Sequence, residues 1–145
     1  RQRSAGYGGV IPIFLKRILD SKPPIIYGSG EQTRDYTYIT DTLAAVLLAE
    51  GKPVYGYPVN IGTGCEISVN QIAALLLKLC GAQRQHKLKP QHVEERPGEV
   101  ASLVCNPGLA ESVYGWKPKV KFEDGLFNLW RWTTSGAAEA WTKDR

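Results

Sequence analysis

The sequence predicts a single α/β domain spanning residues 1–145, in which short strands alternate with about five helices. Three observations support this fold class. Apolar residues recur at helical spacing in several segments, short apolar runs lie between those segments, and glycine or proline separates the two kinds. The chain is long enough to bury a core, and its 43% apolar and 22% charged residues are typical of a globular protein.

A helix over 10–19 and a strand over 24–27 are the first elements expected. The apolar residues of the helix keep three- and four-residue spacing, and Pro12 is tolerated in its first turn. Pro23 and Pro24 prevent the helix from continuing. The strand then leads directly into a glycine turn at residues 28–30.

Arg34 is the first candidate binding residue. A planar guanidinium beside a flexible glycine turn provides the paired donors that phosphate oxygens accept. A second interpretation of the same residues is a surface turn in which Arg34 pairs with Asp35. Arg96 lies in a comparable turn over 95–99. Two arginines that converge on one diphosphate would form charge-assisted hydrogen bonds worth roughly 1.5–3 kcal/mol each.

The middle of the chain is expected to contain two helices with a strand between them. The first helix covers 41–50 with a wide apolar face, and Gly51 is expected in the left-handed conformation that ends many helices. Residues 57–61 predict a buried strand, and the capping-box sequence 68–71 begins a helix that ends near Cys80. This helix is expected to bury Ile72, Ala73, Leu75, Leu76 and Leu79.

The C-terminal third is expected to contain one strand and two helices. Residues 83–95 are mostly polar and are interpreted as a solvated connection, whereas 100–105 predict a strand. A short helix begins with Asn106 as N-cap and ends at Gly115, and a last helix covers about 123–134. The inner face of the short helix is expected to consist of Leu109, Ala110, Val113 and Trp116.

No complete catalytic or cofactor-binding motif is present in the sequence. The turn Gly62-Thr63-Gly64 resembles part of a dinucleotide-binding loop, but Ile67 occupies the place of its third glycine and Arg84 that of its acidic residue. No tyrosine is followed by a lysine four residues later, and G-x-S-x-G, P-loop and H-E-x-x-H motifs are absent. We therefore expect no catalytic and no cofactor-binding residue in this chain.

Composition excludes several other classes of function. Three cysteines without C-x-x-C spacing argue against a disulfide framework or a zinc site and indicate a reducing, cytoplasmic compartment. His86 and His92 have the wrong spacing for a helical metal pair, so no metal is expected. The net charge of +4 suits an anionic ligand but is too diffuse to predict nucleic-acid binding, and no apolar run is long enough to cross a membrane.

Taken together, these segments resemble the C-terminal half of the NAD-dependent epimerase/dehydratase family, the extended short-chain dehydrogenases that act on nucleotide sugars. Residues 27–41 match G-x-G-x-Q-x-R-D-(F/Y)-x-(Y/H)-(V/I)-x-D, 60–64 match N-(I/L)-G-x-G, and 96–99 match R-x-G-(D/E). Residues 1–2 resemble the end of the family's N-x-Y-G-P-R-Q loop, and 109–118 end in a similar L-G-(W/Y)-x-P sequence. The matches follow the family's order along nearly the whole chain.

The resemblance implies a set of substrate-binding residues. Arg34 and Arg96 fall on the positions that bind the nucleotide diphosphate, and Glu99 falls on an acidic position near the ribose or diphosphate. Val10 and the backbone of 25–27, which includes Ile26 and Tyr27, fall where the family contacts the base, usually uracil. Asp35 is expected to brace the Arg34 loop rather than touch the ligand.

The resemblance also implies what this chain does not contain. The family's glycine-rich NAD loop and tyrosine–lysine pair belong to an N-terminal Rossmann part, which is not found here. Together with the lack of methionine and the start at Arg1, this indicates a fragment. We expect the full-length enzyme to use NAD, and this chain alone to bind none and to be inactive.

The expected function is to bind the nucleotide diphosphate of a nucleotide sugar, of the UDP or dTDP type, as part of an NAD-dependent sugar 4-epimerase. A dehydratase or decarboxylase fragment, or a non-catalytic nucleotide-sugar-binding or assembly module, are the alternatives. In the family, the helix over 41–50 and the strand near Asn60 pack on the Rossmann part. Without that part we expect an exposed apolar face, covered by self-association or by rearrangement of these elements.

Overall fold

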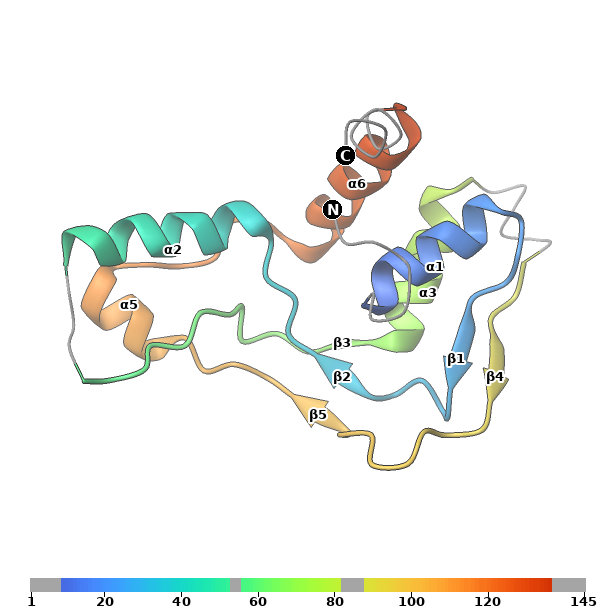
Figure 1. Cartoon of the computed structure of the whole chain (residues 1–145), viewed down its shortest axis with the longest axis horizontal. Helices are drawn as coiled ribbons and strands as arrows, with labels where there is room; N and C mark the ends of the chain where they lie inside the picture. Colours follow the sequence, from blue (N-terminus) through green and yellow to red (C-terminus); the bar gives the residue numbers. More distant parts are fainter. Residues whose placement is uncertain (1–8, 53–55, 82–87, 137–145) are drawn as a thin grey trace, which may run out of the picture. The chain divides into compact units, whose positions relative to one another are not determined.

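The computed structural model describes residues 9–52, 56–81 and 88–136 and has the predicted mixed α/β fold (Figure 1). The chain divides into two compact units. The first contains residues 1–32, 68–99 and 126–145, and the second contains 33–67 and 100–125. Each unit is thus assembled from segments that are distant in sequence. The expected family match at residues 1–2, together with Arg84 and His86, lies outside the described residues.

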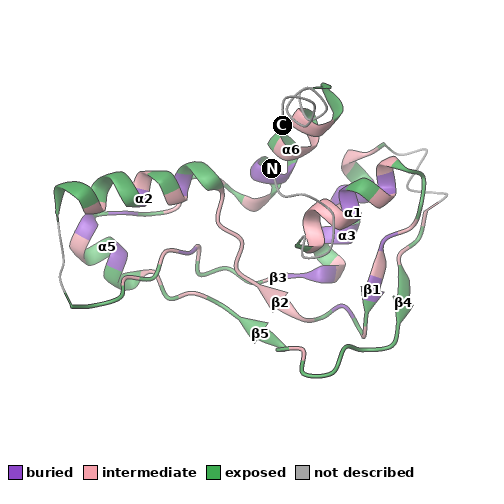
Figure 2. Ribbon diagram, viewed as in Figure 1, coloured by how far each residue is buried: buried purple, intermediate pink, exposed green. Residues whose placement is uncertain are grey.

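The first unit contains two helices that pack on each other and a pair of short parallel strands. Helix α1, Val10–Leu19, coincides with its predicted bounds and packs against α3, Val69–Leu79. Strand β1, Ile25–Tyr27, pairs in parallel with β4, Gln91–Val93. The buried residues of the two helices, purple in Figure 2, form the core of the unit. These side chains are Phe14, Leu15, Ile18, Val69, Ile72, Ala73, Leu76 and Leu77.

Both ends of α3 form as predicted. The Ser68 hydroxyl accepts a hydrogen bond from the Gln71 amide at 3.1 Å, and the Gln71 side-chain oxygen accepts one from the Ser68 amide at 2.8 Å. Gly81, just after the helix, has a φ of +107°. The predicted inner face was partly wrong, because Leu75 and Leu79 are half-buried whereas Leu77 is buried.

Strand β4 lies within 83–95, which the sequence analysis interpreted as a solvated connection. All three β4 residues are exposed, so the strand shows no apolar alternation that could have revealed it. It forms because the backbone of β1 is available as a partner, not because its own side chains are buried.

The second unit contains two helices and short strands. Strand β2, Thr33–Arg34, pairs in parallel with β5, Ser102–Leu103. Strand β3, Ile67–Ser68, is the neighbour of β2 on its other side, and the division between the units falls within it. Helix α2, Ile39–Gly51, packs against α5, Gly108–Tyr114. Helix α6, Phe122–Thr134, crosses from the second unit into the first. The core of the second unit consists of Ala45, Ala110, Tyr114 and Trp116.

Asp41 connects the parts of this core. It is 4% exposed, and its carboxylate accepts hydrogen bonds from the amides of Lys119 and Val120 at 3.0 and 2.9 Å. Its backbone carbonyl accepts a hydrogen bond from the indole N–H of Trp116 at 2.9 Å. The first turn of α2 is therefore fixed to the extended segment that follows α5.

Several predictions for the second unit were wrong. Residues 57–61 form no strand and contain no buried residue. A strand needs a neighbouring strand as its hydrogen-bond partner, and no strand in the described part of the chain pairs with them. Gly51 is the last residue of α2 and has no positive φ. Pro107, not Asn106, is the N-cap of α5. The predicted inner face of this helix was partly wrong, because Leu109 is 45% exposed whereas Tyr114 is buried. The Gly115 C-cap, with φ of +67°, forms as predicted.

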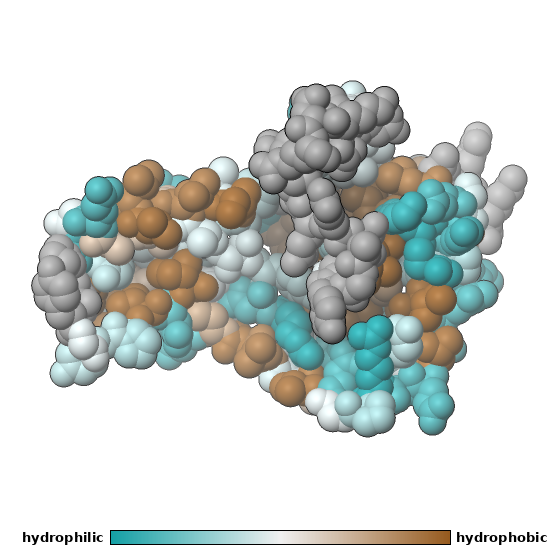
Figure 3. Space-filling view, in the orientation of Figure 1, coloured by the Kyte–Doolittle hydropathy of each residue, from teal (hydrophilic) through white to brown (hydrophobic). Residues whose placement is uncertain are grey.

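An apolar surface extends along α2, as the sequence analysis expected. Its large side chains remain exposed, and apolar residues gather over this helix in the space-filling view (Figure 3). The exposed fractions are 61% for Ile39, 54% for Leu43, 61% for Val46 and 69% for Leu47. Among the described residues, no helix has the length and apolar character needed to span a membrane.

Candidate nucleotide-binding site

Tyr27 and Arg96 form the best-defined part of the candidate site. The guanidinium carbon of Arg96 lies 3.8 Å from the centre of the Tyr27 ring. Tyr27 ends β1 and Arg96 follows β4, so the pairing of these two strands brings the two residues together. A cation stacked on an aromatic face keeps its N–H groups, which lie in the guanidinium plane, available to an anion.

The turns next to this pair have defined geometry. The Gly28 amide donates to the Val93 carbonyl at 2.9 Å, and Nδ1 of His92 is 2.8 Å from the Gly28 carbonyl oxygen. Gly28 has a φ of +71°, which other residues rarely adopt. After Arg96, the Glu99 amide donates to the Arg96 carbonyl at 3.3 Å, which closes the predicted turn.

Glu99, Ile26 and Val10 also lie in the first unit. Glu99 is half-buried, and its Oε2 atom is buried without a hydrogen-bond partner among the described residues. Ile26 is 1% exposed, so its backbone rather than its side chain is what a ligand could contact. Val10 is half-buried at the first position of α1.

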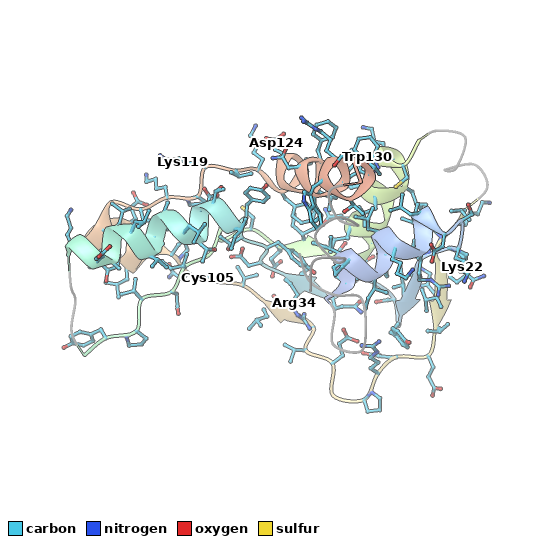
Figure 4. All side chains as sticks on the ribbon, turned by 45° about the horizontal axis from the view of Figure 1, so that its top comes forward. Lys22, Arg34, Cys105, Lys119, Asp124 and Trp130 are labelled. Carbon is cyan, nitrogen blue, oxygen red and sulfur yellow. The ribbon has the colours of Figure 1, made fainter. Side chains whose placement is uncertain are left out.

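Arg34 belongs to the second unit, on β2 (Figure 4). Its Nη1 atom donates to the carbonyl oxygens of Thr33 and Val100, both at 2.7 Å. Its other guanidinium nitrogens donate to no described residue. Arg34 and Arg96 are thus in different units, and their convergence on one diphosphate stays a prediction.

Asp35 has the bracing role that the sequence analysis expected. Its carboxylate accepts hydrogen bonds from the Thr63 hydroxyl at 2.6 Å, the Thr63 amide at 2.9 Å and the Gly64 amide at 2.8 Å. The Cys105 amide adds a longer contact at 3.4 Å. Partial burial by itself raises the pKa of Asp35, but these hydrogen bonds stabilise the carboxylate and leave its pKa below the ordinary value.

The turn over 62–64 is filled by the protein's own side chains. A Cβ atom on Gly62 would lie 2.3 Å from Cβ of Cys105 and 2.8 Å from Oδ2 of Asp35. Burial and the neighbouring Asp35 charge raise the pKa of the Cys105 thiol. Because Asp35 already occupies the amides of Thr63 and Gly64, the turn does not fit a dinucleotide pyrophosphate.

Sequence reasoning missed the residues that support Tyr27. The Gln32 side-chain amide donates to the Tyr27 carbonyl at 3.0 Å, and Asn70 contacts the turn between them. Gln32 is part of the motif quoted above, and Asn70 lies inside the predicted capping box, but neither pattern indicated these contacts.

The comparisons with known proteins identify the family. A family model described as GDP-mannose 4,6 dehydratase matches residues 1–129. The chain belongs to the NAD-dependent epimerase/dehydratase family. Among its relatives, the human dTDP-D-glucose 4,6-dehydratase is 34% identical over 130 residues, which cover 85% of this chain and 36% of that protein. The family assignment made from the motifs is therefore confirmed.

Solved structures of this epimerase/dehydratase family share the fold. A crystal structure of UDP-glucose 4-epimerase with UDP-glucose from Thermotoga maritima has a TM-score of 0.85 and 34% identity, covering 94% of this chain and 43% of that one. A UDP-glucuronic acid 4-epimerase from Bacillus cereus, in complex with UDP-glucuronic acid and NAD, has a TM-score of 0.80 and 27% identity. It covers 93% of this chain and 41% of that one. The chain thus spans well under half the length of the family members that it matches, and corresponds to a C-terminal part of them.

Proposed function

We propose that this chain binds the diphosphate of a UDP- or dTDP-sugar, as the substrate-binding part of an NAD-dependent sugar 4-epimerase. The observation that carries the proposal is the stacked pair of Tyr27 and Arg96, at 3.8 Å, inside a family motif. The stack fixes the guanidinium plane, so that its N–H groups can bind phosphate oxygens at a low entropic cost. The backbone edge of β1 beside Tyr27 is the proposed contact for the base.

Arg34 and Glu99 are the other residues proposed to bind the ligand, each from its own unit. The guanidinium nitrogens of Arg34 that donate to no described residue would supply a second set of donors to the diphosphate. The Oε2 atom of Glu99, buried without a partner among the described residues, would accept a hydrogen bond from a ribose hydroxyl.

NAD is proposed to bind elsewhere in the full-length enzyme. When bound, NAD accepts and returns a hydride at the sugar. In the glycine turn over 62–64, which resembles part of a dinucleotide loop, the amides of Thr63 and Gly64 already donate to Asp35. The role left for this chain is to hold the nucleotide while the sugar reacts, which is a positioning function.

The apolar face of α2 is proposed to be covered in the assembled protein. Leu43, Val46 and Leu47 are each more than half exposed, although they are apolar and belong to one helix. The relatives are more than twice as long as this chain, and their remaining Rossmann part is the proposed cover.

In the isolated chain we expect self-association through this face. Multi-angle light scattering should detect dimers or larger species, and a Leu47→Glu variant should be monomeric. A monomer for both proteins would contradict this.

Titration calorimetry with UDP, dTDP, GDP and NAD tests the proposal. UDP or dTDP should bind and NAD should give no heat. Arg96→Ala should weaken the binding by roughly tenfold or more, since it removes charge-assisted hydrogen bonds. Lys89→Ala, an exposed charge in the same unit, is the matched control and should bind as the original chain does. Equal binding by Arg96→Ala and Lys89→Ala would refute the assigned role of Arg96.

Dehydratase or decarboxylase activity of the parent protein, and a non-catalytic nucleotide-sugar-binding module, are the alternative proposals. All of them use the same anchoring of the nucleotide diphosphate. A cytoplasmic location is proposed on the basis of the three cysteines, an odd number without C-x-x-C spacing. Turnover of UDP-glucose, dTDP-glucose and UDP-glucuronate by the protein with its Rossmann part would distinguish the reaction types.

A further inference from the structure

The turn that follows Tyr27 is held by the first turn of helix α3. The backbone amide of Asn70 donates to the Gly30 carbonyl at 3.0 Å. Nδ2 of the same side chain donates to the Ser29 carbonyl at 3.0 Å and to the Glu31 carboxylate at 2.6 Å. One residue therefore makes three hydrogen bonds to three consecutive residues of the turn.

Gly30 shows how closely Asn70 fits this turn. Gly30 is buried with a φ of +79°, and a Cβ atom there would lie 2.2 Å from Oδ1 of Asn70. No side chain other than that of glycine fits between the turn and Asn70. The contact fixes the path of the backbone, because the glycines at 28 and 30 would otherwise allow many conformations.

Two hydrogen bonds transmit this restraint to Tyr27. At the end of the turn, the Gln32 side chain donates to the Tyr27 carbonyl at 3.0 Å. At its start, the Gly28 amide is fixed to Val93 at 2.9 Å. The Tyr27 backbone is thus held between α3 and β4, and its ring lies under the Arg96 guanidinium.

We propose that Asn70 is a positioning residue for the Tyr27–Arg96 pair, acting through the turn over 28–32. Its effect on ligand affinity rests on the proposed function, whereas its effect on the stacked pair does not. Without Asn70 the turn samples other conformations and the stacked arrangement is populated for only part of the time. If that fraction falls to roughly one fifth, the apparent dissociation constant for UDP rises roughly fivefold.

The chain offers a control that separates this role from simple support of α3. Gln71, the next residue, forms the capping box with Ser68, and its hydrogen bonds in the described part of the chain do not reach the turn over 28–32. Gln71→Ala should therefore destabilise the start of α3 without moving Tyr27. Asn70→Ala removes both N–H donors of the side chain. Asn70→Asp also removes them and keeps the size of the side chain, while it adds a negative charge that suits the start of a helix.

The experiment measures the ¹⁵N–¹H signal of the Arg96 side-chain Nε group in the labelled chain. A proton above an aromatic face is shielded, so this signal is shifted upfield in the stacked pair. Arg96→Lys identifies the signal, and Tyr27→Leu gives its position without the ring. In Asn70→Ala and Asn70→Asp the signal should move most of the way toward its position in Tyr27→Leu, whereas in Gln71→Ala it should not move. The UDP dissociation constant should rise roughly fivefold in the two Asn70 variants only.

Each outcome decides the question. An unchanged Arg96 signal in folded Asn70→Asp, or an equal change in Gln71→Ala, overturns the proposal. If no protein binds UDP, the original chain included, the proposed function fails, and the Arg96 signal still decides whether Asn70 positions the pair. If Asn70→Ala does not fold, Asn70→Asp decides alone, and a failure of both to fold makes Asn70 a structural residue and overturns the proposal.

Discussion

The two arginines that the motifs single out are used differently in the structure. Arg34 donates to two backbone carbonyls, at 2.7 Å each, and so takes part in holding β2 beside the segment that precedes β5. Arg96 makes no such bond to a described residue, and its guanidinium rests on the Tyr27 ring. One sequence signal, an arginine in a turn next to glycine, therefore occurs both at a residue whose guanidinium partly supports the fold and at a residue whose guanidinium makes no hydrogen bond to a described residue. Stability measurements distinguish the two.

The largest effect is expected for Asp35, the residue beside Arg34. Asp35→Ala should lower the free energy of unfolding by about 3 kcal/mol, because the Thr63 and Gly64 amides lose their acceptor. Urea unfolding followed by tryptophan fluorescence measures the change. Glu50→Ala, an exposed carboxylate in the same unit, should change the value by less than about 0.5 kcal/mol. Similar small effects in both variants would show that the Asp35 hydrogen bonds contribute little.

The same carboxylate predicts a pH dependence. Its pKa is lowered in the folded chain, so its stabilising contribution is complete above its ordinary pKa of 3.8 and is lost as the pH falls through the lowered value. The stability difference between the original chain and Asp35→Asn should therefore narrow at acidic pH. Urea midpoints measured from pH 7 down to 3 test this. If the stability difference between the original chain and Asp35→Asn grows as the pH falls, the Asp35 carboxylate is not the stabilising group.

Arg34→Ala should have an intermediate effect on stability. It should lower the free energy of unfolding by about 1.5 kcal/mol, because the Thr33 and Val100 carbonyls lose a charged donor. Lys52→Ala, which removes an exposed charge from the same unit, is the control and should be close to neutral. If Arg34→Ala is as stable as this control, then Arg34 has no structural role and the comparison with Arg96 fails.

Arg96→Ala should have the smallest effect on stability, about 0.5 kcal/mol, because an exposed cation–π contact contributes no more than this. Its loss of nucleotide affinity should nevertheless be large. A thermal-shift assay with and without UDP measures both quantities on one sample. If Arg96→Ala unfolds readily, Arg96 holds strands β1 and β4 together. It would then have a structural role like that of Arg34, which holds β2 beside the segment that precedes β5.

Local sequence signals predicted the helices well. The bounds of α1, the capping box at Ser68, the positive φ of Gly81 just after α3 and the C-cap at Gly115 follow from apolar spacing and from single residues whose conformational preferences are strong. The same reasoning failed for residues 57–61, since a buried apolar run becomes a strand only beside another strand. It also missed β4, because residues whose side chains are all exposed form a strand when a partner backbone is available.

The spatial arrangement of the candidate site residues could not be predicted from the sequence. Tyr27 and Arg96 are 69 positions apart, and only the pairing of β1 with β4 brings them together. The acceptor of Arg34 at Val100 is 66 positions away and has no side-chain signature, since it is a backbone carbonyl. Asn70 was hidden for the same reason, because its partners are mostly backbone atoms of the turn.

The carboxylate of Asp35 joins the backbone of 63–64 to the segment at 105, although neither stretch is helix or strand. Hydrogen exchange should therefore report these irregular stretches as one cooperative unit. The amides of Thr63 and Gly64 should show protection comparable with that of regular secondary structure, and they should lose it together when Asp35 is replaced.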